Sequence, residues 1–201
     1  AGLLPPESGT ILFHNPDGSL QYPKVGYMLQ RDHLFEWRTV YRNVTLGLEL
    51  HHMLTPDRLQ KVDRLLTEYG LDKFRDKRPS ELSGGMKQRA ALIRTLALEP
   101  QLLLLDEPFS ALDYQTRLMV SADICRLIRA AGKTMIIITH DLSEAISLAD
   151  RIIVLSGRPA TVKKEVSVKL TLQEDTPLAA RNAPEFQQYF NRLWEDMTHE
   201  K

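Results

Sequence analysis

Four consecutive leucines at 102–105 are followed directly by two acids, Asp106 and Glu107. A continuous apolar run of this length is typical of a strand in a parallel sheet, where helices cover both faces. In open α/β sheets, ligands bind beyond the carboxyl ends of the strands. The run therefore predicts an α/β fold and places two carboxylates where a ligand would bind.

Strand-like and helical segments alternate along much of the chain. Strands are expected at 24–29, 102–105, 135–139 and 151–156, and helices at 56–69, 83–98, 118–131 and 142–149. This alternation predicts a parallel sheet, of which 151–156 is a further strand. The stretch from about 30 to 100 is mostly helical, so we expect an inserted helical subdomain there. Residues 161–201 are expected to form a C-terminal extension with a terminal helix at 183–194.

The composition excludes several classes of protein. The formal net charge of zero argues against a general nucleic-acid binder, which needs an excess of Lys and Arg to neutralise phosphates. Cys125 is the only cysteine, so an intramolecular disulfide and a metal site built from cysteines are both excluded. No apolar run reaches the roughly 18 residues that span a bilayer, so a link to a membrane must pass through a protein partner.

The segment LSGGMKQR at 82–89 predicts a helix that begins with small residues. Free backbone N–H groups and the positive end of the helix dipole can face an anion there. Gly84 and Gly85 would let that anion approach the backbone closely, and Ser83 is a typical N-cap.

Four further positions suggest phosphate chemistry. Asp106 would hold Mg²⁺ through water, because Mg²⁺ keeps much of its hydration shell. Glu107 would act as base or orient the water that attacks a γ-phosphate. His140 follows the strand at 135–139, beside the Asp106 strand in the inferred sheet, and could contact the γ-phosphate and the attacking water. Gln30 follows the first strand and could sense the γ-phosphate or Mg²⁺.

In this order the segments resemble ABC ATPases, over about residues 1–157. LSGGMKQR resembles the signature motif, LLLLDEP the Walker B strand, SALD at 110–113 the D-loop, His140 the switch histidine and Gln30 the Q-loop glutamine. The resemblance implies a P-loop NTPase-like fold, hydrolysis of ATP with Mg²⁺, and a head-to-tail homodimer. It also implies that Ser83, Gly84, Gly85, Gln88 and Asp113 contact nucleotide, with the signature motif completing the site of a second ATPase subunit.

The segment LFEWRTV at 34–40 is similar to the importer segment that meets a cytoplasmic helix of the membrane partner. Exposed Phe35 and Trp37 would suit that anchor role, with core packing as the alternative. The stretch at 113–117 is similar to the nitrate, sulfonate and taurine importers. These likenesses imply transmembrane permease subunits as partners, a periplasmic or extracellular solute-binding protein as an indirect one, and a peripheral place on the cytoplasmic face of the membrane.

The family's P-loop, G-x-x-x-x-G-K-[ST], cradles the phosphates with its backbone N–H groups and Lys. Gly132-Lys133-Thr134 fails this pattern, because Leu127 stands where its first glycine is required and a strand follows it. We therefore expect residues 1–160 to be an N-terminally truncated ATPase domain that alone neither binds ATP tightly nor hydrolyses it.

Two other functions compete with this interpretation. A non-catalytic regulatory or interaction subunit could keep the fold without the P-loop, although the presence of Glu107 and His140 argues against it. An ABC ATPase of DNA repair or translation is disfavoured, because long coiled-coil insertions or tandem cassettes do not fit in 201 residues.

Overall fold

The computed structural model describes residues 2–14, 17–110, 112–130, 132–174 and 176–198. Within these ranges the chain forms two compact units. The first lies within residues 2–116 and 128–138, and the second within residues 117–127 and 139–198. Helix α5, Tyr114–Ala130, contributes residues to both.

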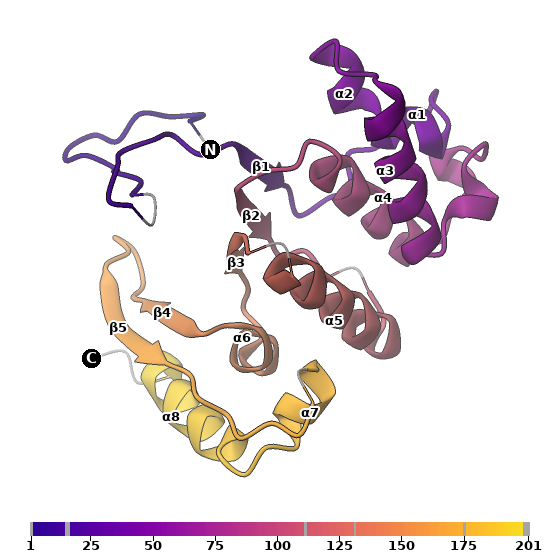
Figure 1. Cartoon of the computed structure of the whole chain (residues 1–201). Helices are drawn as coiled ribbons and strands as arrows, with labels where there is room; N and C mark the ends of the chain where they lie inside the picture. The colour runs from indigo at the N-terminus through magenta and orange to yellow at the C-terminus, as the bar shows by residue number, and fades with distance from the viewer. Residues whose placement is uncertain (1, 15–16, 111, 131, 175, 199–201) are drawn as a thin grey trace. The chain divides into compact units, whose positions relative to one another are not determined.

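The first unit contains a three-stranded parallel sheet with the order β1-β2-β3 (Figure 1). Its strands are β1 (Val25–Met28), β2 (Leu102–Asp106) and β3 (Thr134–Ile138). The parallel sheet predicted from the apolar runs is confirmed. Asp106 pairs with Ile138, so the carboxyl ends of β2 and β3 lie at the same edge of the sheet.

Four helices lie close together in the first unit (Figure 1), and all of them fall within the mostly helical stretch predicted at about 30–100. They are α1 (Val40–Val44), α2 (Leu46–Leu50), α3 (Pro56–Glu68) and α4 (Gly84–Leu96), with short 3₁₀ helices at Asp72–Phe74 and Pro79–Glu81. Helix α3 begins at Pro56, whose fixed φ suits the first helical turn. It ends before Gly70, which adopts a left-handed φ of 65°. The apolar face of α3, with Val62 and Leu66, is buried.

The second unit packs helices against a two-stranded sheet. Strand β4 (Arg151–Leu155) pairs antiparallel with β5 (Val162–Ser167). The helices are α6 (Leu142–Leu148), α7 (Pro177–Arg181) and α8 (Phe186–Thr198). The core consists of buried residues from both strands and two helices: Ile146, Val154, Val166 and Leu193. Helix α8 agrees with the predicted terminal helix.

The prediction that residues 151–156 continue the parallel sheet is wrong. In the described part of the chain, β4 pairs with β5 and with no strand of the parallel sheet. Strand β5 was missed because its sequence, VKKEVS, contains three consecutive charged residues and only Val166 is buried. So few apolar positions leave the period-two pattern of a half-buried strand too short to detect.

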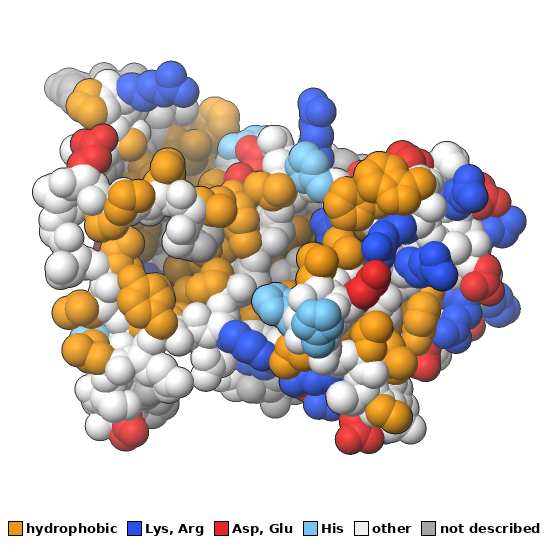
Figure 2. Space-filling model, turned by 90° about the horizontal axis from the view of Figure 1, so that it is seen from above, with side chains coloured by type: hydrophobic (Ala, Val, Ile, Leu, Met, Phe, Trp, Pro, Cys, Tyr) orange, Lys and Arg blue, Asp and Glu red, His pale blue; other side chains and the backbone are white. Residues whose placement is uncertain are grey.

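Hydrophobic side chains are visible on the molecular surface (Figure 2). Large exposed examples in the first unit include Leu4, Trp37, Ile136 and Ile138. None of the helices in the described ranges is both long enough and apolar enough to cross a bilayer.

Candidate functional site

Glu107 lies directly beyond the end of β2 in an unusual backbone conformation. Its φ is 44°, in the left-handed region that residues other than glycine rarely adopt. Hydrogen bonds hold its backbone there: its N–H donates to the Ile138 carbonyl over 2.8 Å, and its own carbonyl accepts from the Ser110 N–H over 3.2 Å and from the Ser110 hydroxyl over 3.0 Å. Strained conformations of this kind persist where neighbouring contacts fix them, and they are common at functional sites.

Gln30 and Glu107 are brought together, as two neighbouring parallel strands would bring them. The Gln30 side-chain nitrogen Nε2 donates to Glu107 Oε2 over 2.7 Å. Gln30 follows β1 and Glu107 follows β2, and these strands are paired in register from Val25 with Leu102 onwards. The hydrogen bond joins residues 77 positions apart in the sequence, so it depends on the sheet.

The segment 82–89 forms the start of helix α4, as predicted. Ser83 is its N-cap, and its hydroxyl accepts from the Met86 N–H over 3.3 Å. A Cβ added at Gly85 would lie 3.2 Å from Thr116 Cγ2 and 3.4 Å from Leu112 Cδ2. The helix start therefore packs closely against the segment that includes the predicted D-loop, and this contact itself favours a glycine at position 85.

Gln88 points into the protein. Its side chain is 3% exposed, and Nε2 donates to the Pro108 carbonyl over 2.6 Å. Gln88 thus connects helix α4 to the turn that follows Glu107. The sequence pattern contained no signal for this structural contact, and the predicted role of Gln88 in nucleotide binding stays a prediction.

Asp113 is exposed and hydrogen bonded to the start of α5. Its carboxylate oxygen Oδ1 accepts from the Thr116 N–H over 3.0 Å, and hydrogen bonds from Thr116 lower the pKa of Asp113. In the segment SALD, Ala111 lies outside the described residues. Gly84 is the first residue of α4 and is exposed, as an anion-binding helix start requires.

Asp106 is the last residue of β2 and is half-buried. In the described ranges no group of three or more His, Cys, Asp or Glu side chains could hold a metal ion. One carboxylate and the amide oxygen of Gln30 nevertheless fit Mg²⁺, which retains several waters and usually binds phosphate oxygens as well. The donor set therefore suits a metal that arrives with a nucleotide.

His140 is exposed and belongs to the second unit, two residues beyond the last residue of β3. The next residue, Asp141, caps α6 by accepting from the Ser143 and Glu144 N–H groups, and Arg117 pairs with Asp141 over 3.0 Å. Glu144 is buried, and burial raises the pKa of its carboxyl. Sequence reasoning did not single out Glu144, because an acid within a short helix is unremarkable.

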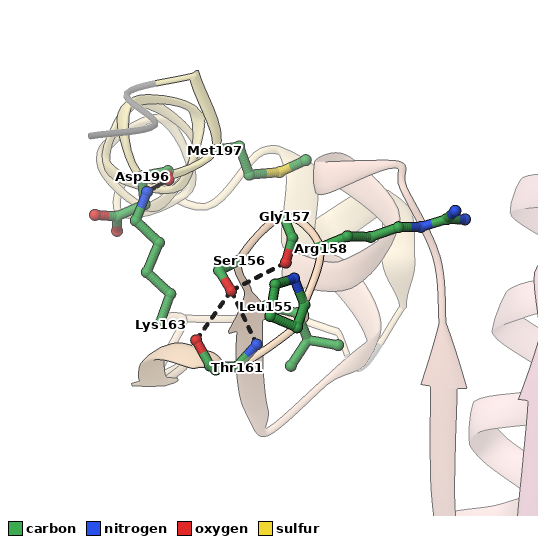
Figure 3. Close-up of a pocket in the computed structure, with 9 residues that line it drawn as sticks. Leu155, Ser156, Gly157, Arg158, Thr161, Lys163, Asp196 and Met197 are labelled. Atoms are coloured by element: carbon green, nitrogen blue, oxygen red, sulfur yellow. Dashed lines mark hydrogen bonds between the residues drawn. The ribbon is translucent and has the colours of Figure 1, made fainter.

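A separate pocket lies at the turn between β4 and β5 (Figure 3). Its volume is about 730 Å³, and its lining includes Arg158, Lys163 and Asp196. At the turn, the Ser156 hydroxyl bonds to both the N–H and the hydroxyl of Thr161. This lining includes none of the predicted site residues.

The sequence matches the family described as "ABC transporter" over residues 1–110. It is 42% identical to an ABC transporter ATP-binding protein of Bacillus subtilis, over 98% of this chain and 76% of the relative. It is 40% identical to the nitrate import ATP-binding protein of Synechocystis, over 96% and 74% of the two chains, and 37% identical to the taurine import ATP-binding protein of Roseobacter denitrificans, over 100% and 76%.

Two solved structures are similar to this chain. One is a dimeric ATP-binding cassette in a post-hydrolysis state with ADP and Pi, at 31% identity and a TM-score of 0.64, over 73% of this chain and 63% of that one. The other is cbiO1 of Clostridium perfringens, part of the ABC transporter complex cbiONQ, at 31% identity and a TM-score of 0.58, over 65% of this chain and 52% of that one. The chain thus spans less than two thirds of each of these structures.

Proposed function

The chain belongs to the family of ABC transporter ATP-binding proteins, whose members hydrolyse ATP, and on that premise we propose that it is most of the ATPase subunit of an importer. The observation that carries the proposal is the 2.7 Å hydrogen bond between Gln30 and Glu107. It joins a neutral amide, suited to sensing phosphate or metal, to a carboxylate suited to orienting water.

Bound ATP and Mg²⁺ would supply the γ-phosphoryl group and the positive charge that stabilises its transfer. Glu107 lies just beyond the carboxyl end of a parallel strand, where ligands bind in such sheets. There its carboxylate orients the attacking water and accepts its proton. Asp106, at the same strand end, would hold the metal. Gln30 would offer its amide oxygen to the metal and would sense the γ-phosphate, while its amide nitrogen donates to Glu107.

The remaining site residues complete a composite site between two ATPase subunits. Ser83, Gly84 and Gly85 offer the N-terminus of α4 to nucleotide held mainly by a second subunit, and Gln88 supports this helix start from inside the protein. Asp113 lies on the segment that packs against Gly85. His140 contacts the γ-phosphate and the attacking water.

The segment after Gln30 forms the contact with the transmembrane permease subunits. Trp37 is 72% exposed, and its ring lies 4.8 Å from that of half-buried Phe35. An aromatic pair with one exposed ring suits an anchor in a protein interface. The subunit would then lie peripherally at the cytoplasmic face of the membrane, and a solute-binding protein outside the membrane would act only through the permease.

The transported solute is proposed to be a small anion of the nitrate, sulfonate or taurine kind, because relatives named for nitrate and taurine import are 40% and 37% identical to this chain. Residues 1–160 are proposed to form the ATPase domain, with about 30–100 as its helical subdomain and 161–201 as an extension. The 201 residues contain no P-loop sequence, so this chain alone is proposed to be inactive.

The role of Glu107 can be tested in a chain that is preceded by the P-loop segment of a relative. Glu107→Gln should lower ATP turnover by about 10²- to 10⁴-fold, the usual contribution of a general base, and should accumulate an ATP-bound dimer. The exposed residue Glu68 offers the control Glu68→Gln, which should leave turnover unchanged. Unchanged turnover in Glu107→Gln would refute the assignment of the base.

A further inference from the structure

Arg94, on helix α4, binds the backbone of the segment that follows Gln30. Its Nη1 donates to the His33 carbonyl over 2.7 Å, and its Nη2 donates to the Asp32 carbonyl over 2.6 Å. The two acceptors are consecutive in the sequence and lie 61 and 62 positions from Arg94. One guanidinium therefore fixes two adjacent peptide groups, which its planar fork allows and a lysine ammonium does not.

The position of Arg94 is costly unless these bonds are made. The side chain is half-buried, and burial lowers the pKa of its guanidinium, an effect that the nearby Asp32 carboxylate opposes. Withdrawing a guanidinium from water without hydrogen-bond partners is strongly unfavourable. The two hydrogen bonds to these carbonyls thus compensate for the burial of the guanidinium, and they hold the Arg94 side chain beside Asp32 and His33.

The backbone that Arg94 holds is itself strained. His33 has a φ of 45°, in the left-handed region, as does Glu107 with 44°. A residue other than glycine stays in this region only when its surroundings fix it. The two residues with a left-handed φ are therefore both held by hydrogen bonds. Arg94 holds His33, and Ile138 and Ser110 hold Glu107.

We propose that Arg94 is a positioning residue for Gln30: by clamping the Asp32 and His33 carbonyls to α4, it holds the Gln30 amide against Glu107. The proposal rests on the roles proposed above for Gln30 and Glu107. Through Arg94, helix α4, which begins with the segment LSGGMKQR, directly contacts the segment after Gln30.

A second set of hydrogen bonds holds the backbone nearby, at Phe35. Asn43 is fully buried, accepts from the Phe35 N–H over 2.8 Å and donates to the Phe35 carbonyl over 3.1 Å. The backbone is thus bound to α4 at His33 and to α1 at Phe35. These contacts fix the segment between Gln30 and Trp37 at two separate points.

The test is the side-chain amide resonance of Gln30 in the uniformly ¹⁵N-labelled 201-residue chain, assigned by its loss in Gln30→Ala. Glu107→Ala removes the acceptor and supplies the reference position for an unbonded amide. Arg94→Lys keeps the charge but loses the fork, and it should move the Gln30 resonance at least halfway to that reference. The matched control is Arg89→Lys, on the same helix, because Arg89 donates to the Tyr69 carbonyl over 2.7 Å; this variant should leave the resonance in place.

An unmoved Gln30 resonance in Arg94→Lys, or equal movement in both lysine variants, would overturn the proposal. The unsubstituted chain gives a second measurement that no folding defect can obscure. There, the Arg94 Nη protons should show restricted rotation because two carbonyls hold them, and fast rotation would also overturn the proposal. None of these measurements requires ATP, so a failure of the proposed ATPase activity would be seen separately, in the turnover of the Glu107→Gln chain.

Discussion

Strands β2 and β3 are neighbours with similar apolar sequences and very different exposure. On β2, Leu103 and Leu105 are 0% and 1% exposed, whereas on β3 Ile136 and Ile138 are 51% and 61% exposed. In the described part of the chain, β2 pairs with a strand on each edge and β3 pairs with β2 alone. An apolar run therefore predicts a strand, while the burial of its side chains depends on what packs around it.

The turns that follow the two strands are also held differently. Beyond β2, the buried amide of Gln88 donates to the Pro108 carbonyl. Beyond β3, Thr139 forms a hydrogen bond with the buried carboxyl of Glu144. One turn is therefore fixed by a neutral group whose contact is independent of pH, and the other by a group that titrates.

The largest expected effect separates the two strands directly. Leu103→Ala should lower the free energy of unfolding by about 2–5 kcal/mol, because it leaves a cavity in a fully buried position. Ile136→Ala should cost about 1 kcal/mol or less, because the side chain is already half in water. Urea denaturation of both variants measures the difference, and equal losses would contradict the contrast between the strands.

A smaller effect is expected at the turn after β2. Gln88→Ala leaves the buried Pro108 carbonyl without its donor and should cost about 1–3 kcal/mol. The exposed residue Gln60, on helix α3, provides the control Gln60→Ala, for which we expect a change of about 0.5 kcal/mol or less. Thermal or urea unfolding would measure both, and a Gln88→Ala loss no larger than that of the control would show that the contact adds little stability.

The smallest effect is a pH dependence at the turn after β3. Burial raises the pKa of Glu144 above its ordinary value of 4.5, while Asp141 raises it further and Thr139, Arg117 and His140 lower it. The folded chain therefore holds this proton more tightly than the unfolded chain does. The resulting stabilisation is complete below about pH 4.5 and is lost as the pH rises through the folded-state pKa.

Glu144→Gln removes this titration. Its unfolding free energy should consequently fall less than that of the unsubstituted chain as the pH rises from 4.5, measured by urea denaturation at a series of pH values. Parallel pH profiles for the two proteins would show that Glu144 is not the titrating group.

The sequence predicted the parts of the fold in which local pattern and tertiary surroundings agree. The run at 102–105 became a buried strand, as predicted, whereas the contact of Gln30 with Glu107 follows from the parallel pairing of β1 and β2, which the sequence did not predict. Strand β5 could not be predicted, because three of its six residues are charged.

Residue-level contacts that depend on distant partners were also beyond the sequence. Nothing in the helical spacing of 84–96 distinguishes Gln88, which turns inward to Pro108, from any other polar helix residue. Arg94 likewise finds its partners 61 and 62 residues away. Such contacts follow from how the segments pack, which no local periodicity encodes.

We propose a division between two parts of the ATPase. The residues of this chain determine its family and fold, whereas tight binding of phosphate requires a P-loop sequence that these 201 residues do not contain. Isothermal titration of the 201-residue chain with Mg-ATP tests this division most directly, with the chain preceded by the P-loop segment of a relative as the positive control. We expect the control to bind with a micromolar or lower Kd and the 201-residue chain to show no binding in that range. Micromolar binding by the 201-residue chain alone would contradict it.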